Sequence, residues 1–177
     1  MSKLRHIYLS FLFGAYLAGC ASTPLLDAVY RQEYKAVVQM VEAGKEDINS
    51  KDGSDRTPLI IAAYYNYSPI LEYLVNHGAK LDEFDTSGKT ALHYTVRYGS
   101  LENAKLLLEK GADPNIEDYE GNTPIFNAAY YNRIELVKLL LLHGANPNVR
   151  NNAGYTPYYY AKQYNYKEIM ALFEQYK

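Results

Sequence analysis

The chain alternates short apolar segments with polar turns, and its first apolar segment differs from the rest. Ile7 to Ala18 is a run of 12 residues interrupted by Ser10 and Gly14, whereas a membrane-spanning helix needs about 20 apolar residues. From residue 22 onward, amphipathic segments with helical spacing come in pairs, as in residues 101–108 and 134–142. A threonine, usually followed by proline, precedes the first segment of each pair, which suits a helix N-cap and its first helical residue. The pattern predicts an all-α chain of short helix pairs.

The helix pairs recur with a period of 33 residues after an initial spacing of 34. The threonines that mark the period are Thr23, Thr57, Thr90, Thr123 and Thr156. Glycines follow the first four by 21 residues, where the second helix of each pair would end, namely Gly44, Gly78, Gly111 and Gly144. Residues that tolerate a left-handed backbone stand at the tenth position of the last four units, namely Asn66, Gly99, Asn132 and Asn165. A fixed period of this length indicates a stack of repeats.

These motifs resemble the ankyrin repeat, whose pattern includes T-P-L-H-x-A. The best match is residues 88–93 (GKTALH), and residues 111–115 (GADPN) close that repeat. The resemblance implies an all-α ankyrin-repeat solenoid of about five helix-turn-helix repeats with β-turn fingers, the first and last acting as caps. We place the repeats at about 22–52, 53–85, 86–118, 119–151 and 152–177.

The N-terminal segment resembles a bacterial lipoprotein signal peptide. Lys3 and Arg5 precede the apolar run, and the sequence LAG then leads directly into Cys20. The resemblance implies a signal peptide at residues 1–19, cleavage before Cys20, a covalent lipid on that cysteine, and an ankyrin domain at residues 20–177. The alternative is an ordinary signal peptide with an incidental cysteine. Ala21 at the next position favours the outer membrane, facing the periplasm.

The composition of the chain excludes several kinds of partner and binding site. The formal net charge of −2 argues against a nucleic-acid partner, because phosphate binding needs a basic surface. The single cysteine excludes an intramolecular disulfide and a cysteine-based zinc cluster within the chain. The 20 tyrosines, with no tryptophan, are far more than ordinary usage gives. A specific use of phenol side chains is therefore expected.

The tyrosines concentrate where the ankyrin resemblance predicts a concave surface. The eighth and ninth positions of each repeat, counted from its threonine, would point there, and seven of these ten residues are tyrosine. The predicted partner-binding residues at these positions are Tyr30, Arg31, Tyr64, Tyr65, Arg97, Tyr98, Tyr130, Tyr131 and Tyr164, with Gln163 beside them. Finger residues Arg56, Lys89, Tyr119 and Tyr155 complete the predicted surface. The alternative is that these rings mainly pack sideways on their neighbours, and we assign Tyr158, Tyr159 and Tyr160 to the core or cap.

The sequence favours a binding protein over an enzyme. The motifs of serine hydrolases, zinc proteases, phosphate-binding loops and thiol redox sites are missing from it. His77 and His143 stand two repeats apart, so they cannot share a metal ion, and each is expected to hydrogen-bond between repeats at a helix end. The resemblance assigns His93 to bracing a turn. We therefore expect no catalytic residue, no metal and no cofactor other than the lipid on Cys20.

Three uses of such a protein remain open. The first is an immunity protein that inhibits a toxic secreted effector, such as a phospholipase. The second is a scaffold or protector of a resident envelope enzyme, for example in stress or peroxide defence. The third is a binder of glycan or peptidoglycan, since phenol rings stack on sugars. In the first two cases the partner is another protein. The chain is expected to be monomeric apart from its partner and to be held at the membrane by its lipid anchor.

Overall fold

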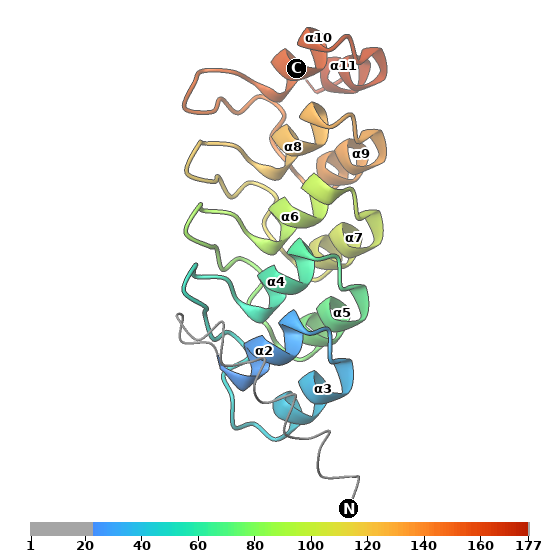
Figure 1. Cartoon of the computed structure of the whole chain (residues 1–177). Coiled ribbons are helices and arrows are strands. Elements are labelled where there is room, and N and C mark those ends of the chain that lie inside the picture. Colours follow the sequence, from blue (N-terminus) through green and yellow to red (C-terminus); the bar gives the residue numbers. More distant parts are fainter. Residues whose placement is uncertain (1–22, 177) are drawn as a thin grey trace, which may run out of the picture.

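A computed structural model describes residues 23–176, which form ten α-helices in two parallel rows (Figure 1). The inner row is α2 (Pro24–Tyr30), α4 (Pro58–Tyr64), α6 (Ala91–Tyr98), α8 (Pro124–Tyr130) and α10 (Pro157–Gln163). The outer row is α3 (Tyr34–Glu42), α5 (Ser68–Asn76), α7 (Leu101–Glu109), α9 (Ile134–Leu142) and α11 (Lys167–Glu174). Among these residues the only β pairing is an isolated bridge between Phe84 and Thr90, so the all-α prediction is confirmed.

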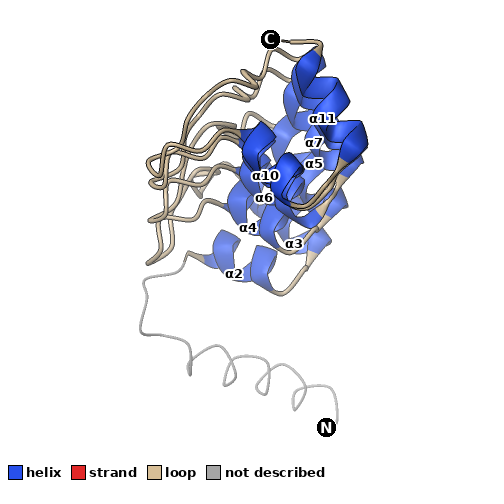
Figure 2. Ribbon diagram, turned by 90° about the horizontal axis from the view of Figure 1, so that it is seen from above, coloured by secondary structure: helices blue, strands red, loops and turns tan. Residues whose placement is uncertain are grey.

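Each helix packs on its own pair member and on the corresponding helices of the neighbouring pairs. Loops project from one side of the two rows, and Figure 2 shows them stacked over one another. The predicted signal peptide at residues 1–19 and the predicted lipidation site Cys20 lie outside the described residues. No helix within residues 23–176 has the length and apolar character needed to cross a membrane.

The inner helices begin as their sequence predicts. Thr57 Oγ1 accepts a hydrogen bond from the Ile60 amide at 3.2 Å, and proline follows as the first helical residue. Thr23 and Thr156 cap α2 and α10 in the same way. Thr90 differs, because alanine follows it and its hydroxyl hydrogen-bonds with His93 Nδ1 at 3.0 Å. Thr123 differs too, because its buried hydroxyl has no hydrogen-bond partner among the described residues. The repeated threonine therefore fixes most, but not all, of the inner helix starts.

The turn between inner and outer helix depends on a left-handed residue at the tenth position. Asn66, Asn132 and Asn165 have φ values of 56°, 55° and 56°, and Gly99 has 79°. Gln32 holds this place in the first repeat with φ of 57°. The reversal brings the outer helix back against the inner one in every repeat, which places the C-terminal ends of all inner helices in one row.

The core is a continuous strip between the two rows. Fully buried leucine and isoleucine side chains run from the first repeat to the fifth. They include Leu25, Leu59, Leu71, Leu92, Leu107, Ile125 and Leu140. Buried alanines, such as Ala63 and Ala129 near the ends of α4 and α8, let adjacent inner helices approach closely. Truncating one of these leucines to alanine would cost about 2–5 kcal/mol, since cavities in such a core collapse only partly.

Each finger is built on one buried side chain at its base. The carboxylate of Asp85 accepts the amides of Ser87 and Lys89, at 2.8 Å and 3.1 Å. Asp52, Asp118 and Asn151 repeat this pattern. Backbone bonds then join successive fingers, as from the Tyr119 amide to the Ser87 carbonyl at 3.1 Å. These bonds hold the fingers in register along the stack.

Candidate functional site

Tyrosine rings form two contact clusters along the row of inner helices, one in the first three repeats and one in the last two. We call the two clusters together the tyrosine surface; its members are Tyr30, Tyr64, Tyr65, Tyr67, Tyr94, Tyr98, Tyr130, Tyr131, Tyr155, Tyr159, Tyr160, Tyr164 and Tyr166. The C-terminal ends of the inner helices stack in one row beside the fingers (Figure 1). The seven tyrosines predicted at the eighth and ninth positions all belong to it.

The N-terminal half of the tyrosine surface spans the first three repeats. Tyr65 contacts Tyr30 of the preceding repeat edge-on, with 6.2 Å between ring centroids. Tyr64 contacts Tyr98 of the following repeat at 5.6 Å between ring centroids. Tyr65 and Tyr98 are each 45% exposed. One side of each ring is therefore held by a neighbour while the other faces solvent.

The C-terminal half spans the last two repeats. Tyr130 contacts Tyr131 at 5.0 Å, Tyr164 at 5.5 Å and Tyr160 at 5.6 Å, all edge-on. Tyr164 also stacks on Tyr166. Tyr130, Tyr131 and Tyr164 are 42%, 37% and 47% exposed. This half repeats the arrangement of the other: rings fixed by edge contacts with a large open face.

An arginine stands between the two halves. Among the described residues no ring contact links Tyr98 to Tyr130 or Tyr131. Instead the Arg97 guanidinium lies over the Tyr131 ring, 5.9 Å from its centroid. Arg97 and Tyr131 are both exposed. The surface is thus aromatic along its length with a cation near its middle.

Two phenols are anchored on finger carboxylates. Tyr30 donates a hydrogen bond to Asp52, and Tyr94 donates one to Asp85. Burial and this hydrogen bond raise the pKa of both phenols well above the usual range. Burial alone would raise the pKa of the Asp85 carboxyl, but the hydrogen bonds it accepts, led by those of Ser87 and Tyr94, leave that pKa below its usual value. These bonds tie the inner helices to the fingers.

The cationic finger residues have partners within the chain. Arg56 forms an ion pair with Asp52 at 2.9 Å. Lys89 reaches the next finger and pairs with Asp118 at 3.1 Å, and the two side chains are only 15% and 2% exposed. Their charged groups are therefore committed to holding the fingers, which limits what they can offer a partner.

The other predicted residues lie open. Tyr119 is 64% exposed and contacts Phe84 edge-on at a finger. Tyr155 stacks on Tyr159 at 4.1 Å and is 40% exposed. Arg31 and Gln163 are exposed at the two ends of the row. Together these residues extend the accessible surface from the helix ends toward the fingers.

Several members of the tyrosine surface were missed or misassigned by sequence reasoning. Tyr94 and Tyr160 stand at the fifth position of their repeats, one helical turn before Tyr98 and Tyr164. Tyr94 packs parallel to Tyr98, and Tyr160 contacts Tyr130. The i, i+4 spacing was the available signal. Tyr160, assigned to the core or cap, does pack against the core at Phe126, and it also contacts the exposed ring of Tyr130.

The histidines have structural surroundings. His93 is buried; it accepts the Thr90 amide at Nδ1 and donates from Nε2 to the Asn122 carbonyl at 3.1 Å, so it braces the turn of the next finger. His77 bonds to the Tyr73 carbonyl of its own helix at 2.7 Å, so the expectation of a bond between repeats is wrong for it. Among the described residues no cluster of potential ligands could hold a metal ion.

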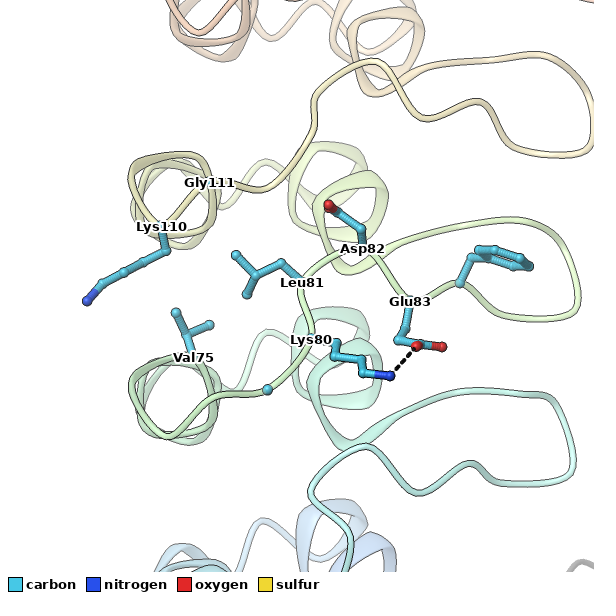
Figure 3. A pocket seen from close by; sticks show the side chains of 9 residues that line it. Val75, Lys80, Leu81, Asp82, Glu83, Lys110 and Gly111 are labelled. Atoms are coloured by element: carbon cyan, nitrogen blue, oxygen red, sulfur yellow. Dashed lines mark ion pairs between the residues drawn. The ribbon is translucent and has the colours of Figure 1, made fainter.

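A shallow pocket of about 650 Å³ lies away from the tyrosine surface. The ends of α5 and α7 and the segment 79–84 line it (Figure 3). Its charged groups include Lys80, which pairs with Glu83 at 3.5 Å, and Asp82, which accepts the Asp113 amide. Burial raises the pKa of the Asp82 carboxyl, and the hydrogen bond from the Asp113 amide partly opposes this rise. The pocket shares no lining residue with the tyrosine surface.

Comparison with known proteins is consistent with this architecture. A family model described as "Ankyrin repeats (3 copies)" matches residues 25–118. A second, described as "Ankyrin repeats (many copies)", matches residues 107–161. An ankyrin repeat protein of Acanthamoeba polyphaga mimivirus is 33% identical over 73 residues, which is 41% of this chain and 10% of that protein. The chain thus spans about a tenth of the length of this curated relative.

Proposed function

The chain belongs to the ankyrin-repeat family, whose arrays are protein-interaction modules, and on that premise we propose that the tyrosine surface binds another protein. The observation that carries the proposal is the row of half-exposed rings, each fixed by an edge contact with a neighbour. Tyrosine offers a large contact area and a hydroxyl with few rotatable bonds. Rings that are already ordered lose little further entropy on binding.

The extent of the surface supports the same proposal. Its members come from all five helix pairs, so a partner lying along it would touch every repeat. A stable protein–protein interface buries about 800 Å² on each partner, and tyrosine and arginine are enriched among its energetically dominant residues. Exposed rings on adjacent helix ends can supply such an area without rearrangement of the backbone.

Photo-crosslinking tests the proposal directly. A photoreactive phenylalanine derivative would replace Tyr98 or Tyr131 in cells, and a matched variant would carry it at Tyr34, an exposed tyrosine on the outer row. We expect one crosslinked protein from positions 98 and 131 and none of it from position 34. Equal crosslinking from all three positions would refute a role for the tyrosine surface.

We further propose that the protein acts in a bacterial envelope, lipid-anchored through Cys20 to the outer membrane and facing the periplasm. The lipobox-like sequence that ends at this cysteine supports the proposal. In a bacterial host Cys20→Ser should release the protein from the membrane fraction or block its processing. Fractionation identical to that of the wild type would contradict the lipid anchor.

In this setting we propose that the partner is a toxic secreted effector enzyme, which the chain blocks as an immunity protein. The lipobox-like sequence and the antibody-like tyrosine content of the tyrosine surface support this use. Cells lacking the gene should be killed by sister cells that retain their secretion systems. Unchanged survival, together with a stress phenotype in pure culture, would instead favour the scaffold of a resident enzyme. Sedimentation with purified cell wall would favour a glycan ligand.

A further inference from the structure

We infer that Arg97 and Arg133 form an acid-recognition subsite at the centre of the tyrosine surface, where a carboxylate side chain of the protein partner binds. The inference rests on the proposed protein-binding function and specifies the chemistry of the partner. The proposed ligand is one Asp or Glu side chain of the protein partner. The partner residues on either side of it would pack on the neighbouring tyrosine rings.

Both guanidinium groups lie in the gap between the ends of α6 and α8. Arg97 is in the last turn of α6 and lies over Tyr131, the residue that follows α8. Arg133 comes two residues after Tyr131, and its side chain folds back against Gly99. A Cβ added at Gly99 would lie 2.9 Å from Cζ of Arg133. The gap therefore brings two cations from adjacent repeats to the point where ring contacts are interrupted.

Neither cation forms an ion pair with a residue that the structure describes. Among residues 23–176 no carboxylate lies within 4.0 Å of the guanidinium nitrogens of Arg97 or Arg133. Both residues are exposed. The finger carboxylates Asp52, Asp85 and Asp118 are buried at the bases of the fingers and bonded there. The chain is acidic overall, yet the centre of its tyrosine surface is cationic.

The first two repeats contain a similar arginine–tyrosine contact, built from different repeat positions, in which the arginine has a carboxylate partner. The Arg56 guanidinium lies over the Tyr30 ring, 5.7 Å from the centroid, as Arg97 lies over Tyr131. Arg56 then donates to Asp52 from Nε at 3.0 Å and pairs with the same oxygen through Nη2 at 2.9 Å. At Arg97 the ring is present, but no carboxylate within residues 23–176 pairs with the guanidinium group. A partner's aspartate or glutamate would complete the set.

Guanidinium chemistry makes this recognition selective. The contact with Tyr131 restrains Arg97, and a guanidinium group can still form a bidentate bond to a carboxylate through its nitrogens. Flanking rings would exclude water when the partner binds, which strengthens the pair. Two guanidinium groups match one carboxylate rather than an extended polyanion, which would require a basic stripe along the array.

Peptide selection with the full-length chain in detergent provides the test. A phage library of random 12-residue peptides would be selected on wild type, on Arg97→Gln/Arg133→Gln and on the matched control Lys110→Gln/Lys167→Gln. The control removes two exposed charges from the outer side. We expect wild type and control to enrich peptides with an Asp or Glu beside apolar residues, and the double arginine variant to lose that enrichment.

Affinity measurements on the enriched peptides complete the test. Replacing the acidic residue with its amide should weaken binding to wild type about tenfold or more, and should change binding to the double arginine variant less than twofold. Enriched peptides without an acidic preference would overturn the subsite while leaving the tyrosine surface intact. A parallel selection would use the triple variant Tyr65→Ala/Tyr98→Ala/Tyr131→Ala. If wild type enriched no more peptides than this variant, the protein-binding function would be refuted. Wild type and the double arginine variant would also be tested with heparin and with anionic vesicles. If wild type bound either as tightly as it binds the enriched peptides, and the double arginine variant lost that binding, the inference would also be overturned.

Discussion

The ion pair between Lys89 and Asp118 gives the sharpest prediction about the fingers. It joins two successive fingers at 3.1 Å with both side chains largely buried. One repeat later, the same two positions hold Asn122 and Asn151, whose amides hydrogen-bond at 3.0 Å. The chain therefore contains a charged and an uncharged version of one contact. Converting the first into the second, one residue at a time, measures what the charges contribute.

The expected cost follows from burial. Lys89→Asn leaves the Asp118 carboxylate, 2% exposed, with its two amide bonds and no cation. Breaking a buried pair costs about 3–5 kcal/mol. The remaining amide bonds and the partial exposure of Lys89 reduce this figure, so we expect a loss of about 2–3 kcal/mol in the free energy of unfolding. Asp118→Asn should cost less, about 1 kcal/mol, because the lysine can turn toward water.

A double-mutant cycle is the appropriate assay. Urea unfolding of wild type, both single variants and the double variant would be followed by circular dichroism at pH 7. The double variant reproduces the native Asn122–Asn151 contact, so it should recover at least about 1 kcal/mol relative to the sum of the single losses. The reasoning is refuted if Lys89→Asn costs less than about 0.5 kcal/mol, or if the two losses simply add.

Two further predictions concern single residues. Gly88→Ala should lower the free energy of unfolding by about 2 kcal/mol more than Gly144→Ala. Both glycines have positive φ, but only at residue 88 would an added Cβ clash, since it would lie 2.8 Å from Tyr119. Equal losses in the two variants would contradict this close approach. Burial lowers the pKa of His93 in the folded chain. As the pH falls below about 6.5, only the unfolded chain therefore protonates this imidazole. The free energy of unfolding should decrease in that range by up to about 1.4 kcal/mol per pH unit. Urea unfolding between pH 7 and pH 5 measures the slope, which His93→Gln should remove and His143→Gln should keep.

Local chemistry in the sequence predicted most of the fold. The threonine caps, the left-handed residues and the 33-residue period are local signals, and the structure uses them as expected at Thr57, Asn66 and Asn132. The hydroxyl of Thr123 shows the limit, because whether it finds a partner depends on packing that no short motif encodes.

The site was predictable only in outline. Counting from each threonine identified exposed rings such as Tyr98, but not the contacts among them. The pairing of Lys89 with Asp118 crosses between fingers, and no local signal marks it. Tyr94 escaped notice because its position holds other residue types in most repeats, such as Ile61 and Asn127. Which side chains meet across a repeat boundary depends on the geometry of stacking.

The affinity of the crosslinked partner for Tyr65→Ala/Tyr98→Ala/Tyr131→Ala tests the central claim most directly. Calorimetric titration would compare wild type, this triple variant and the outer-face control Tyr34→Ala/Tyr176→Ala, whose residues are similarly exposed. Loss of three interface tyrosines predicts a drop in affinity of about 100-fold or more, with the control within about threefold of wild type. Wild-type affinity in the triple variant, or an equal loss in the control, would show that the partner does not bind through the tyrosine surface.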